Sequence, residues 1–291
     1  MDTMPLPQAN IDVATAHAFD PVNTDVVMEI ATNRVSILNG CFDPITLQET
    51  VDWVSRWLQS GRVGYICTVN VAILMMMISD PQLQQFVDKA ALIVADGQPL
   101  VWSSRLFSSR TFLPERVTGI DLVDALARLA EQEGFRVYLL GATSVVIQAA
   151  AQSLQLKYPK LQICGFNDGY FSIAEVPERV QAIRQSGAQI LLVGMGVPRQ
   201  EYFLFENLSD LSVNLAIPIG GSFDVIAGKK RRAPRWMQEY GLEWLYRLLQ
   251  EPCRLWKRYL VTNSQFLCRL LRELLHLQLS RHKTRFKNQP Q

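Results

Sequence analysis

Apolar residues follow two alternating patterns along this chain. Short runs of consecutive apolar residues predict buried strands, and segments whose apolar residues recur every three or four positions predict amphipathic helices. The predicted strands cover residues 35–38, 64–68, 92–95, 136–140, 161–166, 189–193 and 214–217. The predicted helices cover residues 46–58, 71–78, 119–133 and 174–185, and others begin near residues 99, 144 and 201. This alternation predicts an α/β fold with a Rossmann-like, doubly wound, mostly parallel sheet.

The last part of the chain has a different character. Residues 234–250 and 252–280 are predicted helices in which leucine and aromatic residues alternate with arginine and lysine, and no strand remains for them to cover. We therefore expect a disordered, polar leader over residues 1–32, a Rossmann-like catalytic domain over 33–228 and a basic amphipathic helical appendage over 229–291.

Charge is divided unevenly between these parts. The net charge of the 291 residues is +2, but the chain from Lys229 onward holds 15 basic and 4 acidic residues, a net charge of +11. The first 228 residues carry a net charge of −9. This division indicates that the appendage meets an anionic surface, either nucleic acid or anionic lipid.

Composition narrows the class of protein. The 48% hydrophobic and 19% charged content is that of a folded protein. No apolar run approaches the roughly 18 residues of a membrane-spanning helix, and no secretory signal is visible. The five cysteines have no CxxC spacing, which favours reduced thiols in a cytoplasmic protein and argues against a zinc site. Only three histidines occur, so histidine-based catalysis is not expected.

Asp96 is the first candidate for chemistry. It follows the apolar run 92–95 and precedes a turn at Gly97 and a helix expected to start near Pro99. It therefore lies at the carboxyl end of a strand, where open α/β sheets place their ligands. Aspartate is also a favoured helix-capping residue, and spacing alone leaves both interpretations open.

Other polar residues follow neighbouring strands. Thr68 and Asn70 end one strand, Gln200 follows another, and Arg116 precedes a helix. Each residue taken singly also suits helix capping, a loop hydrogen bond or a surface ion pair. Glycine turns occur at Gly141 and at Gly220 and Gly221. Converging at one sheet edge, these groups suit a phosphorylated ligand.

Familiar nucleotide motifs are absent from the sequence. The glycines after two strands do not complete G-x-G-x-x-G, and neither a P-loop nor an Asp-x-Asp motif occurs. A bound nucleotide sugar would therefore need cationic side chains and helix amino-termini to stabilise its diphosphate.

Several segments, in order, resemble one family, the bacterial WecG/TagA/CpsF glycosyltransferases (family 26), over residues 37–259. The matching segments are Thr68-Val69-Asn70, Ala95-Asp96-Gly97, residues 113–119, 138–141 and 196–201, Gly220 to Gly228, Arg232-Ala233-Pro234 and residues 241–248. Gln98 and Pro99 depart from part of the family, which leaves the donor sugar open.

The resemblance implies an inverting glycosyltransferase that needs no metal or other cofactor and acts on a polyprenyl-diphosphate-linked sugar. Well-known members move N-acetylmannosamine from its UDP conjugate to GlcNAc on undecaprenyl diphosphate. By resemblance, Asp96 is the base, with Thr68, Asn70 and Arg116 as further catalytic residues. The substrate-binding residues expected at the site are Gln200, Gly141, Gly220, Gly221, Arg247 and Arg254.

Together these observations predict a peripheral enzyme on the cytoplasmic face of the cell membrane. Its expected partners are a UDP-sugar, a lipid-linked acceptor, an anionic membrane surface and, by resemblance, other copies of the chain, with no nucleic acid. Two alternatives remain from the residues alone: a soluble nucleotide-dependent enzyme on a Rossmann-like sheet, or a non-enzymatic protein whose basic tail binds membrane or nucleic acid.

Overall fold

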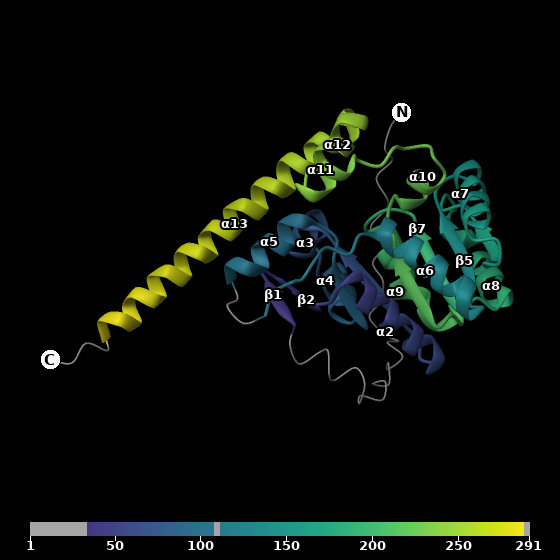
Figure 1. The fold of residues 1–291 in the computed structure, drawn as a ribbon, viewed down its shortest axis with the longest axis horizontal. Helices are drawn as coiled ribbons and strands as arrows, with labels where there is room; N and C mark the ends of the chain where they lie inside the picture. The colour runs from purple at the N-terminus through teal and green to yellow at the C-terminus, as the bar shows by residue number, and fades with distance from the viewer. Residues whose placement is uncertain (1–33, 108–110, 288–291) are drawn as a thin grey trace.

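A six-stranded parallel sheet forms the centre of the molecule (Figure 1). The computed structural model describes residues 34–107 and 111–287, so the predicted leader over 1–32 lies outside the described residues. The strand order is β4-β3-β8-β7-β5-β6. The strands are β3 (Gly64–Val69), β4 (Leu92–Ala95), β5 (Arg136–Gly141), β6 (Gln162–Asn167), β7 (Ile190–Gly194) and β8 (Leu215–Pro218). The predicted α/β class and parallel sheet are confirmed.

Helices cover both faces of the sheet. One face packs against α3 (Val71–Met77), α4 (Pro81–Asp88), α5 (Gln98–Phe107), α8 (Val176–Ser186) and α9 (Arg199–Leu211). The other packs against α2 (Leu47–Gln59), α6 (Gly119–Glu133), α7 (Ser144–Lys157) and α10 (Ser222–Ile226). Because both faces are covered, β3, β4, β7 and β8 are buried along their whole length, which explains their unbroken apolar sequences.

The first predicted strand is wrong in extent. Residues 35–42 form an antiparallel hairpin of β1 (Val35–Ile37) and β2 (Gly40–Phe42), because the chain reverses at Leu38 with a positive φ of 54°. The hairpin is joined to the sheet edge by Asp43, whose carboxylate accepts a hydrogen bond from the Ile93 N–H at 2.7 Å. Helix α4 and the short 3₁₀ helix η1 (Ile173–Glu175) were also not predicted.

The appendage contains three helices, α11 (Arg235–Glu239), α12 (Glu243–Gln250) and α13 (Pro252–Lys287). The prediction of one helix over 234–250 is wrong, because the chain turns at Gly241 with a φ of +66°. A side chain at Gly241 would have its Cβ 2.9 Å from Gln98 and 3.0 Å from Trp102, so this turn lies tightly against α5. The appendage is therefore in direct contact with the helix that follows Asp96.

Helix α13 runs across α3 and α5 and continues past them (Figure 1). Leu255, Phe266 and Leu270 on its inner face are buried. No helix within the described residues combines the length and the apolar character needed to cross a bilayer. The division of the chain at residue 228 stays a prediction.

Candidate active site

Asp96 lies at the carboxyl edge of the sheet, immediately after β4. Its backbone N–H donates to the Val69 carbonyl at 2.8 Å, which extends the pairing of β3 and β4 by one residue. On its other side, the Val117 N–H donates to the Ala95 carbonyl at 2.8 Å, so the segment before α6 runs alongside. Asp96 is thus held between the end of β3 and the segment that carries Arg116.

The Asp96 carboxyl group is partly buried and has no hydrogen-bond donor among the described residues. Helix α5 starts at Gln98, and within the described chain its backbone N–H groups do not bond to Asp96, so the capping contact is not formed. Burial raises the pKa of Asp96 to about 6. Arg247 and Arg116 lower this pKa in part, and Glu243 and Asp121 raise it. Such a carboxylate is ionised at neutral pH and is a stronger base than an exposed aspartate.

Two arginines near Asp96 share one carboxylate. The Arg116 Nη1 donates to Glu243 Oε2 at 2.7 Å, and the Arg247 Nη2 lies 3.5 Å from Glu243 Oε1. Glu243 is 127 residues from Arg116 in sequence and belongs to α12. The appendage therefore brings both a cation and an anion to the end of β4. Sequence reasoning missed Glu243, although it lies in the segment 241–248 that carried the family resemblance.

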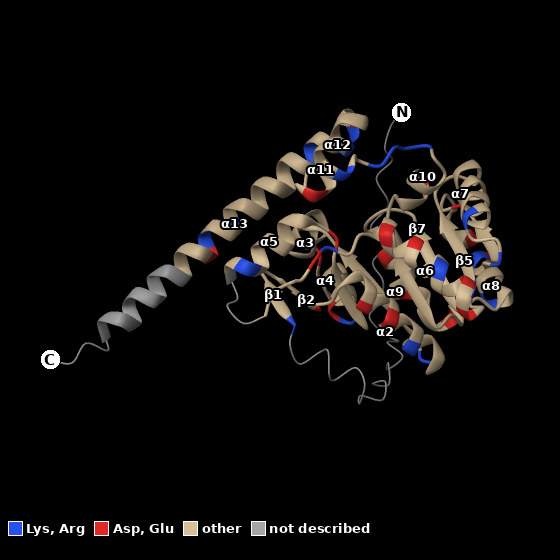
Figure 2. Cartoon of the chain, viewed as in Figure 1, with Lys and Arg blue, Asp and Glu red and all other residues tan. Residues whose placement is uncertain are grey.

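A second ion pair joins the appendage to the sheet domain. Both Asp121 oxygens accept hydrogen bonds from the Arg232 guanidinium at 2.6 Å, and the Thr118 hydroxyl donates to Asp121 at 2.7 Å. Burial alone would raise the pKa of Asp121, but these hydrogen bonds hold it below its usual value. Arg232 follows a run of basic residues that leads into α11 (Figure 2). This pair holds that segment against α6.

Thr68 and Asn70 have structural partners. The Thr68 hydroxyl donates to the Pro218 carbonyl at 3.0 Å and so joins the ends of β3 and β8. The Asn70 Oδ1 accepts from the Ala72 and Ile73 N–H groups and caps α3. Within the described chain, no hydrogen bond engages the Asn70 side-chain nitrogen, which leaves that donor available beside Gly97.

Gln200 supports the glycine turn after β8. Its side chain is buried, its Oε1 accepts from the Gly220 N–H at 3.1 Å, and its Nε2 donates to Glu201 at 2.8 Å. A Cβ placed on Gly220 or Gly221 would meet no atom within 4 Å, so the turn is open on its outer side. Gln200 therefore shapes the turn, and its influence on a ligand would pass through Gly220.

Two predicted residues lie apart from Asp96. Gly141 is at the end of β5, four strand positions from β4 and thus roughly 19 Å away. A Cβ at Gly141 would overlap the Gly194 carbonyl, so this glycine permits the close approach of β5 and β7. Arg254 is exposed and pairs with Glu251 at 2.5 Å. The structure brings Arg116 and Arg247 to Asp96, but not Gly141 or Arg254.

Helix α13 adds groups that sequence reasoning missed. The charges of Asp96 and Arg247 both act on Tyr259. Arg258 has a buried Nε without a hydrogen-bond partner and interacts electrostatically with Glu201. Burial raises the pKa of Glu201 to about 7, and its Oε2 also lacks a partner among the described residues. No pattern in the sequence distinguishes these residues from ordinary helix-surface charges.

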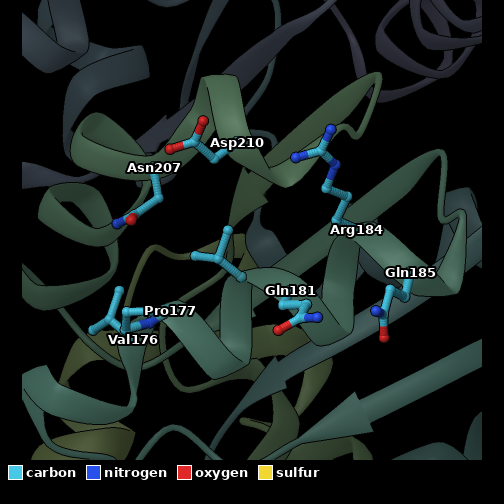
Figure 3. A pocket seen from close by; sticks show the side chains of 8 residues that line it. Val176, Pro177, Gln181, Arg184, Gln185, Asn207 and Asp210 are labelled. Atoms are coloured by element: carbon cyan, nitrogen blue, oxygen red, sulfur yellow. The ribbon is translucent and has the colours of Figure 1, made fainter.

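A separate groove between α8 and α9 contains none of the predicted site residues (Figure 3). It is lined by Val176, Pro177, Val180, Gln181, Arg184, Gln185, Asn207 and Asp210. In the described ranges, 34–107 and 111–287, no three His, Cys, Asp or Glu side chains gather in a way that could hold a metal ion. The carboxyl edge around Asp96 is thus the candidate active site.

The fold and the site define an α/β enzyme with a basic carboxylate and paired arginines at the carboxyl edge of a parallel sheet. The chain belongs to the WecG/TagA/CpsF family of glycosyl transferases, whose family profile matches residues 35–280. The resemblance drawn from the motifs is thereby confirmed, and the protein is a glycosyltransferase.

Curated relatives agree with this assignment. The chain is 32% identical over 215 residues to the N-acetylglucosaminyldiphosphoundecaprenol N-acetyl-β-D-mannosaminyltransferase of Bacillus subtilis, covering 74% of this chain and 82% of the relative. It is 31% identical over 229 residues to the protein of the same name from Staphylococcus aureus strain MW2, covering 78% and 87%. The non-enzymatic alternative does not agree with these relatives.

Proposed function

We propose that this protein transfers N-acetylmannosamine or a related hexose from a UDP-sugar to a polyprenyl-diphosphate-linked sugar. The reaction inverts the anomeric carbon, needs no metal ion and serves the biosynthesis of a cell-surface polysaccharide or teichoic-acid-type glycan. The names of the Bacillus and Staphylococcus relatives support the sugar and the lipid-linked acceptor. A β-linked product from an α-linked nucleotide donor requires inversion.

The observation that carries this proposal is the state of Asp96. Its carboxylate is unpaired among the described residues, its pKa is raised to about 6, and two arginines lie close enough to act on it. A glycosyl transfer with inversion needs one base at the acceptor hydroxyl and positive charge at the leaving diphosphate. At the end of β4, Asp96 can act as the base, and Arg116 and Arg247 provide the positive charge.

In the proposed transfer, one bond forms and one bond breaks at the anomeric carbon of the donor sugar. Asp96 removes the proton of the acceptor hydroxyl as that oxygen forms a bond to the anomeric carbon of the donor sugar. The bond between this carbon and the diphosphate oxygen breaks, and its electron pair leaves with UDP. Arg116 and Arg247 stabilise the charge that develops on the diphosphate. The proton on Asp96 then passes to solvent.

The appendage suits a lipid-linked acceptor. Outside the buried stripe of α13 lie exposed apolar residues at helical spacing: Trp256, Leu260, Leu267, Leu271 and Leu275. Arg269 and Arg272 are exposed on the same stretch of helix. An amphipathic helix of this kind can lie in the interface of an anionic membrane. We place the protein on the inner face of the membrane, with α13 as its contact; self-association stays part of the proposal.

The test is a transfer assay with purified full-length protein, a set of UDP-sugars and a water-soluble GlcNAc-diphosphate-lipid analogue. We expect one donor to yield a disaccharide product and free UDP, at the same rate with and without EDTA. If no donor releases UDP, the proposal fails, and inhibition by EDTA would contradict the metal-free reaction.

A matched pair of variants locates the chemistry. Asp96→Asn keeps the size of the side chain but removes the base, and we expect the rate to fall at least 100-fold, in line with general-base catalysis. Asp210→Asn makes the same change in the groove of Figure 3 and should leave the rate unchanged. Equal rates for both variants would contradict the assignment of Asp96.

A further inference from the structure

Glu243 occupies a position that is unusual for a surface helix residue. It is the first residue of α12, and its side chain is only 13% exposed. One carboxylate oxygen accepts from Arg116 at 2.7 Å and the other lies 3.5 Å from Arg247. The second contact is an ordinary i,i+4 helix pair, but the first joins α12 to the segment beside Asp96. Glu243 therefore connects the two guanidiniums that lie near the candidate base.

The charges around Asp96 would be strongly positive without Glu243. The charged groups that interact with Asp96 come from the segment before α6, from α6, from the α10–α11 connection and from the appendage: Arg116, Asp121, Arg232, Glu243 and Arg247. Asp121 is already bound by Arg232 through two hydrogen bonds. Glu243 is then the carboxylate that balances Arg116 and Arg247.

Loss of the Glu243 charge would alter the base strength of Asp96. Arginine charges near an aspartate favour its ionised form and lower its pKa, whereas a nearby carboxylate has the opposite effect. A carboxylate with a lower pKa is a weaker general base. At the same time, two arginines that must bind one diphosphate are most effective when they are held in place before the substrate arrives.

We propose that Glu243 is a positioning residue of the active site: its carboxylate orients Arg116 and Arg247 for the leaving diphosphate and keeps Asp96 a strong enough base. This inference rests on the proposed function. It also assigns a role to the appendage within the chemistry, separate from membrane contact, because Glu243 reaches Arg116 only when α12 lies against the sheet domain.

The test compares Glu243→Gln with Glu239→Gln. Both substitutions remove one negative charge from the appendage, but Glu239 is exposed on α11. The titration of Asp96 is followed by ¹³C NMR of aspartate carboxyl groups, with Asp96→Asn to identify the signal. We expect Glu243→Gln to lower the Asp96 midpoint by about 0.5 to 1 pH unit and Glu239→Gln to leave it unchanged. An unchanged or raised midpoint in Glu243→Gln would overturn the proposal.

Kinetics give a second readout. In Glu243→Gln the acid limb of kcat/KM should move to lower pH together with the NMR midpoint, and kcat should fall about 3- to 10-fold. Glu243→Asp keeps the charge but shortens the side chain, so its acid limb should stay at the wild-type pH while KM for the donor rises. A limb that moves equally in both variants would contradict the role of charge.

These outcomes separate this inference from the proposed function. The NMR titration needs no donor, so it tests Glu243 even if the wild-type protein transfers no sugar. Thermal unfolding identifies a variant that does not fold. If Glu243→Gln is unfolded, Glu243→Asp decides: a donor KM equal to that of the wild type would overturn the positioning role.

Discussion

Asp96 and Asp121 illustrate how partners decide the state of a buried carboxyl group. Burial acts to raise the pKa of both. Asp121 receives two hydrogen bonds from Arg232 and its pKa stays below the usual value, whereas Asp96 receives none from the described residues and its pKa rises to about 6. Arg116 and Arg247 act on Asp96 only from a distance. The absence of a hydrogen-bond donor among the described residues therefore leaves the Asp96 carboxylate accessible to a substrate hydroxyl.

Glu201 allows a test of buried charge that does not depend on catalysis. Its pKa is raised from 4.5 to about 7 because the side chain is buried, so the folded protein binds this proton more tightly than the unfolded chain. The free energy of unfolding should therefore fall as pH rises from about 4.5 to 7. Glu201→Gln removes this dependence and should be more stable than wild type at pH 8, by up to about 3 kcal/mol, and similar at pH 5.

Urea unfolding at the two pH values measures this difference. Glu206→Gln is the matched control, because Glu206 is exposed on the same helix. Its stability should differ from that of wild type by the same amount at pH 5 and pH 8. If Glu201→Gln also showed a constant difference, the raised pKa of Glu201 would be contradicted.

At the scale of elements, strands were easier to predict than helix boundaries. The sheet is covered on both faces, so its strands are continuous apolar runs that the sequence displays directly. The hairpin over residues 35–42 and the break between α11 and α12 depend instead on local positive φ values, at Leu38 and Gly241. Gly241 is further fixed by contact with Gln98 and Trp102, which a sequence cannot place beside it.

Gly241→Ala tests the docking of the appendage. An alanine at position 241 would have to adopt the strained positive φ of the glycine. Its Cβ would also lie within 3.0 Å of Gln98 and Trp102. Gly61→Ala is the control, because Gly61 has a φ of +70° with no atom near its Cβ position. We expect both variants to lose about 1 kcal/mol from backbone strain. Only Gly241→Ala should also speed hydrogen exchange in α12, and equal exchange in both variants would contradict the tight contact.

The candidate site was predictable only in part, because several of its contacts join residues that lie far apart in the sequence. Asp96 and Arg116 lie in loops next to strands or helices that the pattern places, and Arg247 came from the family resemblance. Glu243 and Arg232 lie 127 and 111 residues from their partners, and nothing in their local sequence indicates those pairs. Gln200 was predicted as a ligand contact, but its buried hydrogen bonds with Gly220 and Glu201 appear only after folding.

Across the molecule, the appendage combines two features: α12 brings Glu243 and Arg247 to the active site, and α13 carries an exposed apolar stripe. Figure 2 shows basic residues gathered where the chain leaves α10 and enters the appendage. Helix α13 combines one buried stripe with one exposed apolar stripe. The buried stripe holds α13 to the domain, and we propose that the exposed stripe contacts the membrane surface.

The double substitution Leu267→Asp with Leu271→Asp tests this division. It places two charges on the exposed stripe, where the side chains are 55% and 58% exposed. Binding to vesicles of anionic phospholipid in a co-sedimentation assay should fall at least tenfold, while transfer to a water-soluble acceptor persists. Leu156→Asp, at a residue 83% exposed on α7, should bind vesicles like wild type. Unchanged vesicle binding by the double variant would contradict the assigned surface.

The pH dependence of sugar transfer reports directly on whether Asp96 is the catalytic base. Its pKa of about 6 predicts that kcat/KM for the donor falls below a midpoint near pH 6, where Asp96 becomes protonated. The Asp96→Asn variant should stay folded, and its residual transfer, at least 100-fold slower, should have no acid limb near pH 6. A midpoint near 4, the value of an exposed aspartate, or an acid limb that survives in Asp96→Asn would contradict this account.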